Sequence, residues 1–213
     1  MSYFTIDPQF SDGDVGELRL YGPDDVHVDG TVFVTGRDPI CDLRVTRDGE
    51  HVIGTDGGYI KVWNIEEKLR GASSLVSALY HSGIKIGAVA VTPDSQRIIS
   101  ADLHSTVRVW LLGGTLESTF LELHKAVGRR KLGREVTGLE ALPDSKHAMS
   151  SSVDRTIKIF GLHDGAVLRT ITCPARVRHI ALLHDGRRFL FVQEGPGSES
   201  ERACIAEHGM SNN

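Results

Sequence analysis

The sequence predicts an all-β protein built from a repeated four-stranded antiparallel sheet. Related segments recur along the chain, GTDGGYIKVWN at 54–64, SADLHSTVRVWL at 100–111 and SSVDRTIKIFG at 151–161. Each follows an Asp-Gly or Asp-Ser turn, and each ends in strand-like alternation of apolar and polar residues. Self-similarity with a period of about 40–50 residues is typical of repeat folds, in which each unit buries its apolar face on the next.

Two independent landmarks define the period of the repeat. The aromatic residue that closes each segment is spaced by 47 and then 50 residues, at Trp63, Trp110 and Phe160. The aspartate that opens the preceding turn is spaced by 46 and 50 residues, at Asp48, Asp94 and Asp144. A fourth turn begins 41 residues later at Asp185, so a fourth unit begins there.

Alternation with a period of two predicts the strands within a unit. The second unit contains four such stretches, separated by turn-forming residues, at 86–92, 97–101, 106–112 and 116–121. After Ile65, charged residues favour one turn of helix before a strand resumes at 75–80.

The two ends of the chain contain parts of the same unit. Residues 11–22 reproduce the closing half around Tyr21, with strands expected at 17–21 and 31–35, and the last unit has strands expected at 189–192 and 203–206. The predicted organisation is an extension at 1–10, a partial unit at 11–36, whole units at 37–80, 81–122 and 123–172, a partial unit at 173–208 and a tail at 209–213.

The polar residues of two units carry a family resemblance. In order, the second unit offers His81, Pro93-Asp94-Ser95, Ser100 and Trp110, and the third offers His124, Pro143-Asp144-Ser145, Ser150, Asp154 and Phe160. Over about residues 11–208 this pattern resembles the WD40-type repeats that build β-propellers. The resemblance implies a WD40-type β-propeller, or a partial propeller arc of about four to five blades, in which buried His, Ser, Asp and Trp side chains form a hydrogen-bonded network.

Each unit departs from that pattern. The second unit has His104 where the turn aspartate belongs, and the third ends in Phe160, which has no N–H group to donate. The first unit offers Asp56 and Trp63 but has no histidine between residues 36 and 40. The sequence therefore predicts degenerate repeats that are held mainly by apolar packing between sheets, with a partial polar network.

Three whole units and two partial ones leave closure of the ring open. Propellers contain about four to eight blades. The chain is expected to form an open arc, a ring completed by a second chain, or a shortened product of a longer gene. An uncovered end would expose strand edges and an apolar face, which proteins usually protect. This consideration favours the second and third alternatives.

Composition limits the classes of partner. The 24 basic and 28 acidic residues give a net charge of −4, which does not indicate binding to nucleic acid or to a membrane surface. The chain has no apolar run of transmembrane length and no signal-peptide pattern at residues 1–10. Cys41, Cys173 and Cys204 show no paired spacing. An intracellular, reducing location such as the cytoplasm is therefore expected.

A basic insertion is the candidate partner-binding feature. His81 precedes Pro93 by 12 residues, whereas His124 precedes Pro143 by 19. The longer loop contains Arg129, Arg130, Lys131 and Arg134, and the family geometry implies that Arg176 and Arg178 lie beside it on one propeller face. Together these cations are predicted to bind an acidic or phosphorylated segment, because the planar fork of arginine matches carboxylate and phosphate groups. The alternative is a solvated loop without a ligand.

The sequence shows no constellation for catalysis, cofactor binding or metal binding. Its ten histidines are dispersed, and no Gly-x-Ser-x-Gly or phosphate-loop motif occurs. Two functional classes remain. The first is the role that the resemblance implies, a non-catalytic scaffold that docks proteins or peptides. The second is a structural subunit or fragment of a longer propeller protein, completed by strand pairing with another chain. A measurement of molecular mass distinguishes these two classes.

Overall fold

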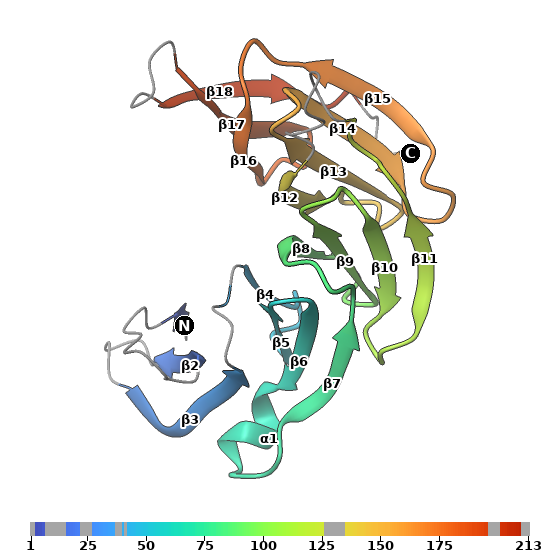
Figure 1. The fold of residues 1–213 in the computed structure, drawn as a ribbon. Coiled ribbons are helices and arrows are strands. Elements are labelled where there is room, and N and C mark those ends of the chain that lie inside the picture. Colours follow the sequence, from blue (N-terminus) through green and yellow to red (C-terminus); the bar gives the residue numbers. More distant parts are fainter. Residues whose placement is uncertain are drawn as a thin grey trace.

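The fold is an arc of antiparallel sheets (Figure 1). The computed structural model describes residues 3–6, 16–21, 27–36, 40, 42–125, 135–195 and 201–209, with side chains at 40, 42–125, 135–195 and 202–209. This part of the chain contains eighteen strands and one short helix, arranged in five sheets. The predicted all-β fold of a partial propeller is confirmed.

Three of the sheets have four strands and two have three. The first sheet contains β1 (Tyr3–Ile6), β2 (Gly16–Tyr21) and β3 (His27–Gly36). The second contains β4 (Leu43–Val45), β5 (His51–Asp56), β6 (Tyr59–Asn64) and β7 (Leu75–Tyr80), with helix α1 (Ile65–Leu69) between β6 and β7. The third contains β8 (Ile86–Val91), β9 (Arg97–Asp102), β10 (Val107–Leu111) and β11 (Leu116–Phe120). The fourth contains β12 (Val136–Ala141), β13 (His147–Ser152), β14 (Thr156–Gly161) and β15 (Val167–Thr172), and the fifth contains β16 (Val177–Leu182), β17 (Arg188–Glu194) and β18 (Glu201–Glu207).

These elements follow the predicted strands closely. The four strands of the third sheet occupy the expected stretches of the second unit, and α1 and β7 occupy the expected helical turn and strand after residue 64. One strand was not expected: β1 lies within residues 1–10, which the sequence suggested to be an extension, and it pairs with β2. The first sheet therefore has three strands where two were expected.

Consecutive strands are neighbours in every sheet, so each sheet is a simple meander. The first strands β4, β8, β12 and β16 lie on the concave side of the arc, and the fourth strands β7, β11 and β15 lie on its outer rim (Figure 1). Strand β12 packs beside both β8 and β16. Each sheet therefore meets the next one face to face, as in a propeller.

The hydrophobic core is divided into layers between successive sheets. Ile53, Ile60 and Val62 of the second sheet pack against Val89 and Ile98 of the third. Further clusters fill the space between the third and fourth sheets and between the fourth and fifth. From the second to the fifth sheet, the facing apolar sides thus cover each other, which is the packing that repeated alternation predicts.

Two irregularities recur in equivalent places. The pairing between third and fourth strands shifts register just before the closing aromatic residue, at Trp63, Trp110 and Phe160. The pairing between first and second strands also shifts, between Ile86 and Ala88, Val136 and Gly138, and Val177 and His179. Because the fifth sheet shares this second irregularity, it is a further copy of the same unit.

The turns after the first strands are also equivalent. Each has an aspartate whose Oδ1 accepts a hydrogen bond from the amide two residues later, at 2.9–3.0 Å, in Asp48, Asp94, Asp144 and Asp185. The residue after each aspartate has positive φ, 76° at Gly49 and 64° at Gly186. This turn geometry explains the Asp-Gly and Asp-Ser pairs of the sequence.

Candidate functional site

The second unit contains a buried chain of hydrogen bonds. His81 precedes β8, and its Nδ1 lies 2.7 Å from the hydroxyl oxygen of Ser100 on β9. The indole N–H of Trp110 on β10 donates to the same oxygen at 2.9 Å. His81 and Ser100 are fully buried and Trp110 is 5% exposed. These bonds tie the loop leading into the sheet to its second and third strands.

The acidic member of this group is Asp102, which the sequence spacing did not indicate. His104 takes the aspartate position counted back from Trp110, but it is exposed. Asp102 lies at the end of β9, and its Oδ1 accepts hydrogen bonds from the amides of His104 and Thr106, both at 2.9 Å. Its Oδ2 lies 3.6 Å from Nε2 of His81. The second unit thus has a carboxylate near His81, although His104 stands where the family pattern has the turn aspartate.

The carboxyl of Asp102 is strongly acidic. Burial by itself would raise its pKa, but the interaction with His81 and the hydrogen bonds from two turn amides outweigh burial and lower the pKa to about 2. Asp102 is therefore ionised at neutral pH.

The third unit builds a denser group around His124. Its Nε2 lies 2.8 Å from the hydroxyl of Ser150, and its Nδ1 lies 3.0 Å from Oδ2 of Asp154 and 3.0 Å from the hydroxyl of Thr156. Burial tends to raise the pKa of Asp154, but the hydrogen bond with His124 contributes to a net lowering. Phe160 lacks a donor and instead packs edge-on against Phe120, with ring centroids 6.3 Å apart.

The order Asp154, His124, Ser150 matches that of a hydrolytic triad, but its setting differs. A catalytic serine must reach a substrate carbonyl. Ser150 and His124 are fully buried, and Asp154 is 6% exposed. The group is therefore closed to substrates in this conformation.

Among the described residues, the second and fifth sheets do not form an equivalent His–Ser–aromatic group. In the second sheet, strand pairing puts Gly54 in the place of Ser100, and Asp56 binds the Lys61 ammonium at 2.6 Å, while Trp63 is buried. In the fifth sheet, pairing puts Phe191 in the serine position and Ala206 in the aromatic position.

The sequence did not predict the role of a basic residue that recurs near the end of the repeated segments. Arg108 and Lys158 each lie two residues before the closing aromatic residue. Arg108 donates to the carbonyl of Tyr80 at 3.3 Å, and Lys158 donates to the carbonyl of Leu123 at 2.7 Å. Each carbonyl belongs to the residue just before the network histidine. The signal was present, because Lys61, Arg108 and Lys158 occupy the same place in the three repeated segments.

The predicted basic surface is described only in part. Arg129, Arg130, Lys131 and Arg134 lie outside the described residues. Arg176 and Arg178 are exposed just before and within the start of β16, at the end of the sheets that carries His81 and His124. They line a hollow of about 480 Å³ together with Glu135 and His179.

Both arginines share one acidic partner. An Arg178 guanidinium nitrogen lies 2.5 Å from Oε1 of Glu194, and Nε of Arg176 lies 3.9 Å from Oε2. The arginines therefore form a small group held by Glu194, and an anionic ligand would compete with that carboxylate.

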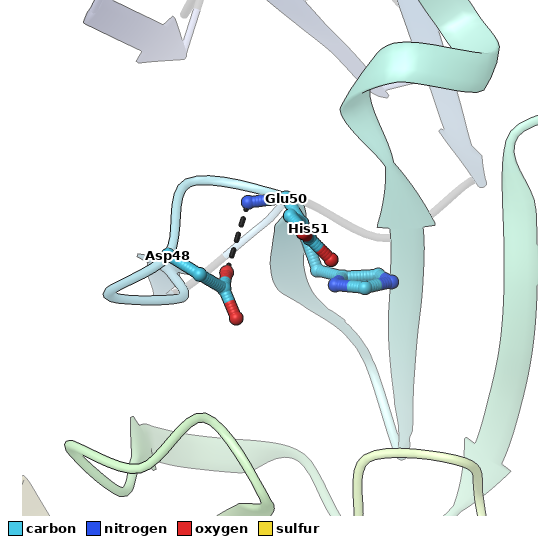
Figure 2. Close-up of side chains that lie close together, drawn as sticks. All are labelled: Asp48, Glu50 and His51. Carbon is cyan, nitrogen blue, oxygen red and sulfur yellow. Dashed lines mark hydrogen bonds between the residues drawn. The ribbon is translucent and has the colours of Figure 1, made fainter.

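Figure 2 shows a separate group of possible ligand atoms at the turn before β5. One oxygen or nitrogen from each of Asp48, Glu50 and His51 lies within 4.8 Å of the others. Asp48 Oδ1 already accepts the Glu50 amide at 2.9 Å, and both acidic residues are exposed. The repeated turn explains this proximity. In the described ranges, no helix is long and apolar enough to cross a membrane.

Comparison with known proteins gives matches within the repeated sheets. The family model of the WD domain, G-beta repeat (WD40), matches residues 73–110 and 129–161. The matched segments end at Trp110 and at Gly161, next to Phe160.

Two curated relatives align with more than half of the chain. The protein hir1 of Schizosaccharomyces pombe is 27% identical over 150 residues, which are 63% of this chain and 15% of that protein. The autophagy-related protein 16 of Arabidopsis thaliana is 27% identical over 128 residues, 60% of this chain and 23% of that protein. The chain thus spans less than a quarter of the length of either relative. Two segments of the chain match the WD40 repeat model, and the arrangement of the described sheets is consistent with a partial WD40 β-propeller.

Proposed function

We propose that this chain is a non-catalytic scaffold that docks protein or peptide segments on the face where the first strands begin. The WD40 repeats support the class of interaction scaffold. The hollow that Arg176 and Arg178 line is the observation that supports this particular face. Burial of the His, Ser and Asp groups supports a structural role for those side chains rather than catalysis.

The preferred ligand of this face is an acidic or phosphorylated segment. Arg176 and Arg178 have side-chain exposures of 57% and 45%, so a ligand can reach both. The basic residues of the 126–134 segment directly precede Glu135 in the sequence, and Glu135 lines the hollow. Arginine binds carboxylates and phosphates through paired N–H groups. Glu194 would then act as an internal competitor that the ligand displaces.

Charge reversal tests this proposal. We expect Arg176→Glu with Arg178→Glu, and separately Arg129→Glu with Arg130→Glu, to lose partners that the unchanged chain captures in a pull-down. Glu194→Gln should retain more of the same partners, because it removes the competing carboxylate. Capture of the same partners by both charge-reversed variants would overturn the site.

A second candidate function is assembly through strand pairing. Among the described residues, β18 is an edge of its sheet, whereas the third strand of each of the three sheets before it is covered by a fourth. Ile205 on β18 is 64% exposed. Exposed edge strands pair readily with strands of other chains.

Solution mass distinguishes the two functions. A monomer by size-exclusion chromatography with light scattering favours the scaffold. An obligate oligomer, dispersed by Ile205→Lys, favours edge pairing. The intracellular location expected from the sequence stays a prediction for both.

A further inference from the structure

A second hollow lies between the third and fourth sheets, at the end opposite Arg176 and Arg178. We call it the inter-sheet pocket; it has a volume of about 500 Å³ and contains Asp94, Asp144, His147 and Asp164. Asp94 and Asp144 follow the ends of first strands β8 and β12, whereas Arg176 precedes first strand β16. The two hollows therefore lie on opposite faces of the arc.

The walls of the inter-sheet pocket are fixed to one another. The amide of Asp94 donates to the hydroxyl of Ser145 at 3.2 Å, which links the equivalent turns of two sheets. The hydroxyl of Ser118 on β11 donates to the carbonyl of His163 at 3.3 Å. Leu162, which is 3% exposed, also lines the pocket. The pocket is therefore formed before a ligand arrives.

The lining is anionic overall. It contains four carboxylates, those of Asp94, Glu117, Asp144 and Asp164, against the cations of Arg97 and Lys146. The guanidinium group of Arg97 is already paired with Glu117, because its Nε and a second nitrogen donate to that carboxylate at 2.6 and 3.2 Å. The positive charge of Arg97 therefore does not balance the other three carboxylates.

The three aspartates of the lining have different partners. Burial tends to raise the pKa of Asp144, but His147, 2.6 Å from its Oδ2, and two turn amides lower it overall. Asp94 and Asp164 use Oδ1 to hold their own turns, through the amides of Gln96 and Ala166. Oδ2 of Asp94 lies 4.0 Å from an Arg97 guanidinium nitrogen, and among the described residues neither this oxygen nor Oδ2 of Asp164 accepts a hydrogen bond.

We propose that the inter-sheet pocket binds the side chain of an arginine or lysine from a protein partner. A volume of about 500 Å³ is within the range of pockets that bind small molecules, which is enough for one long side chain. The carboxylates come from different turns and strands, so they match a long cationic side chain. Among the described residues, the group close enough to chelate an ion is Asp48, Glu50 and His51, which lies elsewhere. Apolar contact with Leu162 suits the methylene stem of either side chain.

A pair of matched small molecules tests the charge requirement. Nα-acetyl-arginine amide and Nα-acetyl-citrulline amide have nearly the same shape but differ in charge. We expect the arginine amide to shift the backbone amide NMR signals of His147 and Asp164 in the full chain, saturably, and citrulline amide to leave them in place. Equal shifts with citrulline amide, or stronger shifts with Nα-acetyl-aspartate amide, would refute the proposal.

Variants test the location. Asp94→Asn with Asp164→Asn should weaken binding of the arginine amide roughly tenfold or more, because hydrogen bonds to charged groups are lost. Asparagine keeps the turn hydrogen bond, so the fold is preserved. Asp48→Asn changes the equivalent turn outside the pocket and should leave binding unchanged. Glu117→Gln releases the charge of Arg97 and should also weaken binding. Undiminished binding in the double variant and in Glu117→Gln contradicts the site.

Discussion

The two buried histidines differ in the number of partners that hold them. His124 contacts Ser150, Asp154 and Thr156 within 3.0 Å, whereas His81 has one contact this short, to Ser100, and a longer approach to Asp102. A buried polar group that loses its partner costs about 1–3 kcal/mol. The third unit therefore depends more on its histidine than the second does.

This difference predicts the effect of alanine substitutions. We expect His124→Ala to lower the free energy of unfolding by about 2–3 kcal/mol and His81→Ala by about 1–2 kcal/mol. Chemical denaturation measures both, and His104→Ala, at an exposed position, serves as the control. If neither buried substitution destabilises the protein, the hydrogen-bonded groups contribute nothing to stability.

The acidity of Asp102 predicts a dependence of stability on pH. Its pKa in the folded chain is about 2, below the ordinary value of 3.8. A lowered carboxyl pKa stabilises the fold fully above the ordinary value, and this contribution is lost as pH falls toward the folded value. We expect the free energy of unfolding to decrease between about pH 4 and pH 2, and to decrease less steeply in Asp102→Asn. Parallel pH profiles for the two proteins would show that another carboxyl is responsible.

Spacing located the histidine, serine and aromatic positions but not the carboxylate of the second unit. Counting back from Trp110 leads to His104, whereas the acidic side chain that reaches His81 starts two residues earlier, at Asp102. Reach across a turn depends on the path of the backbone, which residue spacing does not specify.

Among the elements, the inner strands approach each other most closely where glycine occurs. A Cβ atom at Gly87 on β8 would lie 2.6 Å from the carbonyl oxygen of Val136 on β12. Gly138 on β12 has a similar role, because a Cβ there would lie 3.1 Å from Ile180 on β16. Glycine at these positions lets successive first strands pack side by side.

Gly87→Ala should therefore force the third and fourth sheets apart. We expect a loss of about 1–3 kcal/mol in the free energy of unfolding, as is typical of overpacked cores. Gly113→Ala is the matched control, because a Cβ there meets no atom within 4 Å and its φ is not positive. Thermal or chemical denaturation compares both variants with the unsubstituted protein. Equal stability of Gly87→Ala and Gly113→Ala would mean that β8 and β12 are farther apart than described.

The strands were predictable because each has a clear alternation and is bounded by turn residues. Strand β1 was not expected, since its four residues have no counterpart among the repeated landmarks and its pairing with β2 crosses a long connection. The lack of an equivalent group in the described fifth sheet also depends on strand pairing, because the pairing places Phe191 in the serine position and Ala206 in the aromatic position.

At the scale of the whole molecule, the two ends of the sheets have different chemistry. Arg176 and Arg178 line the hollow on one face, and the inter-sheet pocket on the other face is lined by an excess of carboxylates. Substitutions at distant sites usually act additively.

We therefore expect the two faces to bind independently. Arg176→Glu with Arg178→Glu should leave the affinity for Nα-acetyl-arginine amide unchanged, and Asp94→Asn with Asp164→Asn should leave capture of acidic partners unchanged. The variant with all four substitutions should show both losses, each as large as in the separate double variant. A loss at one face caused by substitutions at the other would indicate coupling through the third and fourth sheets.

The sequence by itself determined the repeat, its period, the strands of the middle units and the resemblance to WD40 repeats, because these depend on local alternation and on turns that the chain specifies residue by residue. Tertiary structure decided which side chains meet. Asp102 approaches His81, Arg108 and Lys158 donate to carbonyls of the preceding loops, and Asp94 meets Ser145, because the tertiary fold joins residues 21 to 51 positions apart. Such contacts depend on the distance and angle between neighbouring sheets, which no pattern along one strand contains.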